Sequence, residues 1–158
     1  MQAEQIETFV DALTYTFKTM LECEVRPSDS SQTKELLPPY SISALVGFSG
    51  DAVGAVVLSL TEATALKAAS ILLQEEITEL DVDAIDAVGE LTNVVVGRAK
   101  AQMTSHELSI SLPNVVTGKD HSVMFPRDVQ PFFVPCDTDC GPLLLAVGLV
   151  NGRTKQNK

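Results

Sequence analysis

The residues best suited to chemistry are a carboxylate and an amide, Glu90 and Asn93, which stand three positions apart. We expect both on one helix covering residues 82–104, because this segment contains no proline and Asp81 precedes it as a capping residue. Side chains at i and i+3 are neighbours on a helix surface. The pair therefore presents hydrogen-bond acceptors and an amide donor side by side.

Asp86 and Gly97 fall on the same face of this helix, together with Lys100, at 100° per residue. Gly97 lies one turn beyond Asn93 and leaves a notch that the backbone of a partner can approach closely. Glycine costs about 1 kcal/mol relative to alanine inside a helix. Two interpretations stay open: a solvated face whose glycine helps helices to pack, or a docking face. The predicted core face is Ile85, Val88, Thr92, Val95, Val96, Ala99 and Met103.

The net charge of −10 and the pI near 4.5 argue against nucleic acid and anionic membranes as partners. Seven acids without an intervening Lys or Arg fall between residues 75 and 90, which favours a basic site on a partner protein. No apolar run approaches the ~20 residues that span a bilayer, and no secretory signal is visible. We therefore expect a cytoplasmic protein with no membrane partner.

The cysteine and histidine residues of this sequence do not have the spacing of metal ligands. Cys23, Cys136 and Cys140 are too few for a disulfide framework, and His106 and His121 lack zinc-ligand spacing with them. No phosphate-binding glycine loop appears either. We expect buried free thiols and no cofactor or metal in this chain.

The order of elements predicts an α/β fold of the α+β type, with a largely antiparallel sheet packed by long helices. Residues 1–150 form one expected domain, and residues 151–158 form a polar C-terminal tail. Further predicted helices cover residues 3–21 and 62–73, the latter capped by Thr61. The predicted strands cover residues 22–26, 41–47, 54–60, 107–112, 121–125, 131–137 and 143–150, with 41–47 and 54–60 as a hairpin.

Glu90-Leu-Thr-Asn93 followed by Gly97 resembles the signature of the CheC/CheX/FliY family of chemotaxis phosphatases. Residues 17–25, 111–121 and 138–147 are also similar to the CheX type, so the likeness runs nearly end to end. No other glutamate has an asparagine three residues on, which favours a type with a single site. Arg98 departs from the family pattern, where a small polar residue is expected.

The resemblance implies a hydrolase that dephosphorylates the phospho-aspartate of a CheY-like response regulator. Asn93 would position the attacking water, and Glu90 would pair with the active-site lysine of the regulator. Asp86 and Gly97 would contribute to binding this partner, and Mg²⁺ would belong to the regulator. The resemblance also implies a homodimer built partly by strand pairing. The alternative is a non-catalytic adaptor or flagellar-switch-like module of the same fold, which docks a receiver without chemistry.

Overall fold

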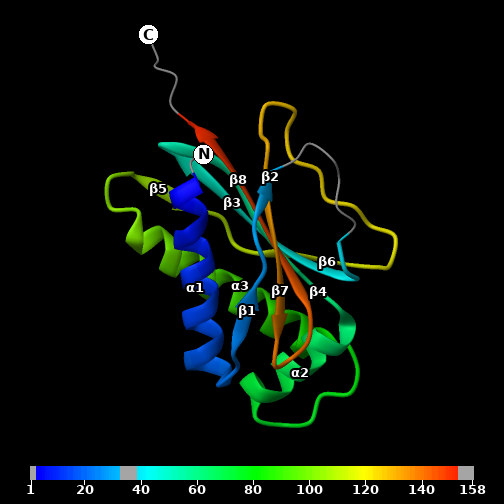
Figure 1. Cartoon of the computed structure of the whole chain (residues 1–158). Helices are drawn as coiled ribbons and strands as arrows, with labels where there is room; N and C mark the ends of the chain where they lie inside the picture. The colour runs from blue at the N-terminus through cyan, green and yellow to red at the C-terminus, as the bar shows by residue number, and fades with distance from the viewer. Residues whose placement is uncertain (1–2, 33–38, 153–158) are drawn as a thin grey trace.

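Three helices begin where the sequence predicts. The computed structural model describes residues 3–32 and 39–152. The helices are α1 (Ala3–Leu21), α2 (Glu62–Leu73) and α3 (Val82–Gln102) (Figure 1). The Thr61 side chain accepts a hydrogen bond from the Thr64 amide at 3.0 Å, and Asp81 accepts one from the Ala84 amide at 2.9 Å. Both predicted caps are therefore confirmed, whereas α3 ends at Gln102 instead of residue 104.

One antiparallel sheet contains all the strands, as the sequence predicts. Its order is β1–β7–β8–β4–β3–β5, with β2 also paired to β7 and β6 also paired to β3. The two strands of the β3–β4 hairpin are longer than expected. They pair with each other as far as Phe48 and Gly54, and beyond these residues β3 continues by pairing with β5 and β4 by pairing with β8. The strands are β1 (Val25–Pro27), β2 (Ser31–Gln32), β3 (Ile42–Gly50), β4 (Ala52–Leu60), β5 (Leu108–Ile110), β6 (Asn114–Thr117), β7 (Phe132–Thr138) and β8 (Leu143–Asn151).

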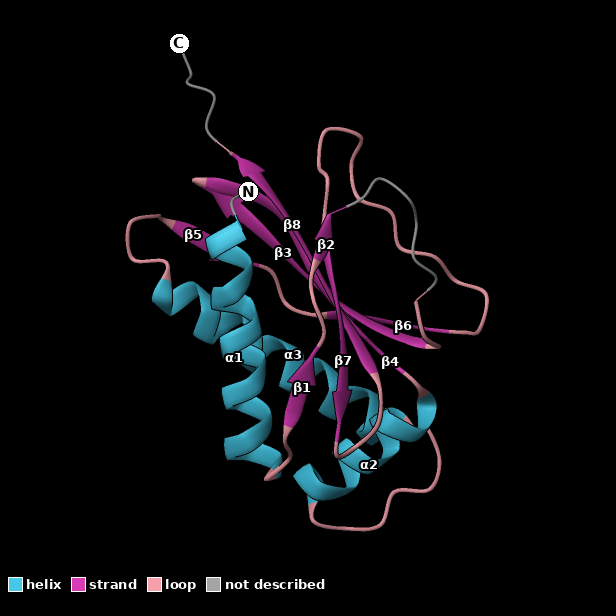
Figure 2. Cartoon of the chain, viewed as in Figure 1, coloured by secondary structure: helices cyan, strands magenta, loops and turns pink. Residues whose placement is uncertain are grey.

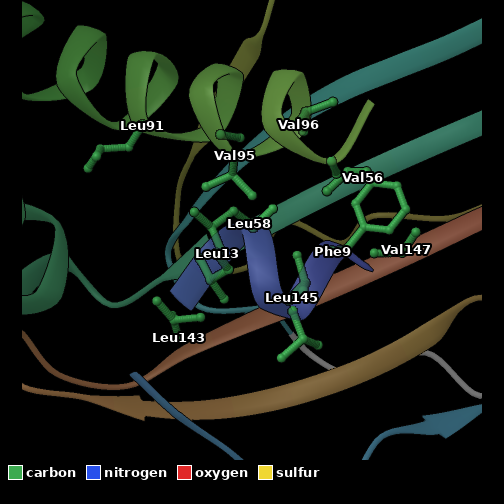
Figure 3. Close-up of a cluster of buried hydrophobic side chains, with 14 of the residues drawn as sticks. Phe9, Leu13, Val56, Leu58, Leu91, Val95, Val96, Leu143, Leu145 and Val147 are labelled. Atoms are coloured by element: carbon green, nitrogen blue, oxygen red, sulfur yellow. The ribbon is translucent and has the colours of Figure 1, made fainter. Parts of the chain in front are cut away.

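The helices cover one face of the sheet and bury the main core there (Figure 2). Figure 3 shows Leu91, Val95 and Val96 of α3 above the strands. Side chains of α1 lie in the same cluster, and the ring of Phe9 meets that of Phe48 edge to face at 5.9 Å. Along β3, β4, β7 and β8 the residues of this core alternate, as the period of two requires. This packing fixes the rotation of α3 about its own axis.

The opposite face of the sheet is covered by the chain between β6 and β7. The predicted strand at residues 121–125 is wrong, because this stretch has no strand partner. His121, Val123 and Phe125 are half-buried, whereas the residues between them are exposed. Val123 and Phe125 pack as part of an irregular segment on a second apolar cluster around Phe133 and Leu144, and His121 shares a hydrogen bond with Ser43. One-sided packing thus reproduces the alternation expected of a strand.

The sequence does not predict strand β6, because Pro113 indicates the end of the preceding strand. In the structure, β5 and β6 both pair with β3 along one edge of the sheet, and Pro113 lies between them. Proline is tolerated at sheet edges, where its missing N–H need not pair with another strand. At the C-terminus, β8 extends to Asn151, and residues 153–158 of the predicted tail lie outside the described residues.

Candidate functional site

Helix α3 turns its apolar face inward almost as the sequence predicts. Val88, Val95 and Ala99 are at most 1% exposed. The buried arc is wider than predicted on one side, because Leu91 packs in the main core and the alanines near the helix start pack against α2. It is narrower on the other side, where Ile85, expected in the core, is only half-buried. The opposite face of α3 consequently points away from the sheet.

The predicted polar face is accessible. Asp86 and Glu90 are exposed, and Asn93 is half-buried. Within residues 3–32 and 39–152, neither the Glu90 carboxylate nor the Asn93 amide has a hydrogen-bond or ion-pair partner. Their hydrogen-bonding groups are available to a partner. The structure therefore brings together the residues proposed from sequence and leaves their polar atoms unengaged.

Gly97 serves no packing role inside the protein. Apart from its chain neighbours and the adjoining backbone of α3, no heavy atom of the described residues lies within 4 Å of a Cβ atom built at this position. Gly89, on the same helix, differs because its Cβ would lie 3.5 Å from Val115 and 3.6 Å from Pro113. The interpretation of Gly97 as a residue that helps two helices to pack is thereby excluded. What remains is an open notch one turn beyond Asn93.

Two features that the sequence did not predict flank this face. On one side, the chain between β5 and β6 packs on Gly89, and Leu112 in that segment is 83% exposed. On the other side, the guanidinium carbon of Arg98 lies 3.6 Å from the ring centroid of Tyr15 on α1. A cation–π pair between two helices has no signature in the sequence, because it depends on how α1 and α3 pack.

The surroundings are strongly acidic. The seven carboxylates between Glu75 and Glu90 are all exposed, along the link from α2 and the first half of α3. In the described part of the chain, no group of three His, Cys, Asp or Glu side chains is placed to hold a metal ion. Among the same residues, no helix is long and apolar enough to cross a membrane. The site thus consists of a carboxylate, an amide and a notch on an acidic helix face.

Comparison with known proteins identifies the family. Residues 42–137, more than half of the chain, match the sequence profile described as chemotaxis phosphatase CheX. This chain belongs to the CheX family. The family profile includes α3 with Glu90, Asn93 and Gly97, so the resemblance found from these residues is confirmed.

Individual CheX proteins are similar over most of their length. CheY-P phosphatase CheX of Thermotoga maritima is 28% identical over 123 residues, which cover 76% of this chain and 79% of that protein. CheX of Desulfovibrio desulfuricans has a TM-score of 0.86 at 26% identity, covering 93% of this chain and 99% of that structure. A CheX of Borrelia burgdorferi, solved in a complex with CheY, BeF3 and Mg²⁺, shares the fold with a TM-score of 0.80 at 20% identity. The match covers 94% of this chain and 99% of that one.

Proposed function

We propose that this phosphatase hydrolyses the phospho-aspartate of a CheY-like response regulator, with Glu90 and Asn93 as the residues that enter the regulator's active site. One observation carries the proposal. A carboxylate and an amide lie next to each other on an accessible helix face, and neither has a hydrogen-bond or ion-pair partner among the residues that the structure describes. Asp86 and Gly97 extend the same face and would contact the docked regulator.

Asn93 would act by positioning water. Hydrolysis of an acyl phosphate needs a water molecule in line with the bond from phosphorus to the aspartate oxygen. The amide oxygen of Asn93 can accept a hydrogen bond from that water, while the amide N–H₂ can donate one. Attack forms the new P–O bond as the aspartate carboxylate leaves, and the proton of the water passes to the phosphate product. Asn93 supplies orientation and accepts no proton.

Glu90 would fix the insertion. Its carboxylate is exposed and unpaired, so it can pair with the active-site lysine of the receiver through a charge-assisted hydrogen bond. The Mg²⁺ of the reaction would be held by the regulator, and the stabilisation of developing charge would come from groups on that protein. A carboxylate on this chain and a lysine on the regulator are consistent with the acidic face of α3, which favours approach to a basic site.

The comparisons support the partner class. The relative from Thermotoga maritima is named for action on CheY-P, and a structural neighbour binds CheY. The alternative is an adaptor that docks the receiver without hydrolysis. An adaptor has no need for an unpaired amide beside the carboxylate, nor for a glycine whose Cβ position is open space.

The test is the decay of acyl phosphate in a receiver domain from the same genome, with and without this protein. We expect decay to accelerate in proportion to the protein added. Glu90→Gln should weaken both binding and turnover, because it removes the charge that pairs with lysine and keeps the shape. A receiver that binds tightly but decays at its intrinsic rate would refute the phosphatase proposal and favour the adaptor.

We further propose that two copies form a homodimer through strand pairing. The C-terminal strand β8 is enclosed between β7 and β4, so it has no free edge. The sheet has one edge at β1 and β2 and another at β5 and β6. We favour the edge of β5 and β6, because it carries two exposed apolar side chains, Val116 in β6 and Leu112 between the two strands. Unpaired edges are suited to pairing between chains. For a dimer of this kind to be active, the exposed face of α3 must stay accessible in both copies.

A further inference from the structure

Arg98 is a cation on the flank of the acidic face of α3, and it differs from Lys100 on that face because an aromatic ring holds it. Its guanidinium stacks on the ring of Tyr15, with 3.6 Å between the central carbon and the ring centroid. Both side chains remain largely exposed. Across the described ranges, no carboxylate forms an ion pair with Arg98, although Asp11 lines the same hollow between α1 and α3.

Stacking of this kind leaves the edge of the guanidinium free. The five N–H donors of arginine lie in the plane of the group, whereas Tyr15 contacts only the flat face. The ring therefore restricts the side chain without using its donors. The hollow beside it measures about 260 Å³ and is lined by Thr8, Asp11, Ala12, Tyr15, Arg98 and Gln102. The arginine is thus held in place with unused donors at the rim of a hollow.

Arg98 also lies close to the proposed chemistry. It follows Asn93 by five residues, which corresponds to about 7.5 Å along the helix axis and about 140° around it. A docked protein that covers Glu90 and Asn93 buries about 800 Å² of this surface, an area that reaches the flank of α3 where Arg98 lies. Arg98 would therefore contact the same partner as Glu90 and Asn93. Arg98 would lie at the rim of the interface, and Glu90 and Asn93 would lie at its centre.

We propose that Arg98, held by Tyr15, is a specificity-determining residue that binds an acidic side chain on the surface of the docked regulator. This inference rests on the proposed function and adds a second, oppositely charged contact to it. Glu90 binds a cation at the centre of the interface, and Arg98 binds a carboxylate at the rim. The two charges together select regulators that carry the complementary pair in the correct orientation and reject those with a basic rim.

The experiment measures KM and kcat for the phosphorylated regulator that the wild-type chain dephosphorylates. Arg98→Ala should raise KM about tenfold, the typical loss for a hydrogen bond to a charged group, and leave kcat unchanged. Tyr15→Ala should raise KM in part, because it frees the arginine, whereas Tyr15→Phe keeps the ring and should match the wild type. Arg127→Ala is the matched control, since it removes an equal charge from an exposed position on the segment that covers the other face of the sheet.

A charge exchange identifies the partner group. The Arg98→Glu variant should be nearly inactive at low regulator concentration. One Asp→Lys or Glu→Lys change on the surface of the regulator should restore the KM of this variant to the wild-type value. An unchanged KM for Arg98→Ala would overturn the inference, as would failure of every acidic-to-Lys change to rescue Arg98→Glu. A lower melting temperature with an unchanged KM would assign Arg98 to stability alone. Failure of the proposed function can be told apart from failure of this inference, because the Asn93→Ala variant would then keep the full kcat of the wild type.

Discussion

Replacement of Gly97 by alanine should make the protein more stable and less active. Beyond the adjoining backbone of α3, a Cβ at this position meets no heavy atom of the described residues within 4 Å, so the methyl group clashes with none of them. Alanine is favoured over glycine in a helix interior by about 0.8–1 kcal/mol. We therefore expect the free energy of unfolding to rise by about 0.5–1 kcal/mol and the melting temperature by about 1–4 °C.

Activity should move in the opposite direction. The added methyl group fills the notch one turn beyond Asn93, where we propose that the regulator makes close contact. A displacement of about 1 Å at the reacting centre is enough to lower turnover about 10²-fold. The loss should appear in single-turnover decay of a phosphorylated receiver, together with weaker binding.

Gly89→Ala is the matched control on the same helix. Its methyl group would make ordinary van der Waals contacts with Val115 and Pro113, at 3.5 Å and 3.6 Å, on a buried side of α3. Calorimetry should show similar stabilisation in both variants, and only Gly97→Ala should lose activity. A Gly97→Ala protein that is more stable and fully active would refute the docking role of the notch. A less stable one would refute the open geometry described for Gly97.

Three further outcomes follow from charge, edges and burial. If the acidic stretch of residues 75–90 steers a basic receiver, the rate of association with that receiver should fall as the salt concentration rises. The reason is that the Debye length shrinks from about 30 Å at 0.01 M salt to about 10 Å at 0.1 M. Stopped-flow association rates that do not change with salt would assign the stretch to solubility alone. Light scattering at micromolar concentration should give a dimer mass, and a monomer mass would count against pairing through β5 and β6. Burial raises the pKa of the Cys136 thiol to about 11, and burial with contact from Cys23 raises that of Cys140 to about 12. Because unfolded thiols ionise near pH 8.5, the free energy of unfolding should not depend on these groups below about pH 8 and should decline above that pH. A thiol reagent at pH 8 should react with them only when the protein unfolds. Rapid labelling of the folded protein would contradict their burial.

The helices and the polar face of α3 were predictable because each has a local cause. Caps at Thr61 and Asp81 and the 3.6-residue period define the helix starts and faces without reference to the rest of the chain. The placement of Glu90, Asn93 and Gly97 on one exposed surface follows from that period alone. The family signature then supplied the chemistry that residue types by themselves left open.

Other features depend on contacts between distant segments and have no local signal. The stretch around Val123 alternates like a strand, yet its alternation comes from packing on the sheet face. The edge strand β6 forms beyond Pro113 because β3 offers it a partner. The stacking of Arg98 on Tyr15 depends on the packing of α1 against α3. Each is decided by tertiary structure, which overrides local propensity.

The most direct test of the proposed mechanism is the single-turnover rate with Asn93→Ala at saturating concentration over a phosphorylated receiver. The Asn93 side chain is half-buried and forms no hydrogen bond with another described residue, so its removal should leave the fold intact. We expect binding close to that of the wild type, because Glu90 and the acidic face remain. The hydrolysis rate should fall by about 10²-fold, which is about 2.7 kcal/mol at 1.36 kcal/mol per decade. A folded Asn93→Ala protein that hydrolyses the bound acyl phosphate at the full rate would contradict the mechanism.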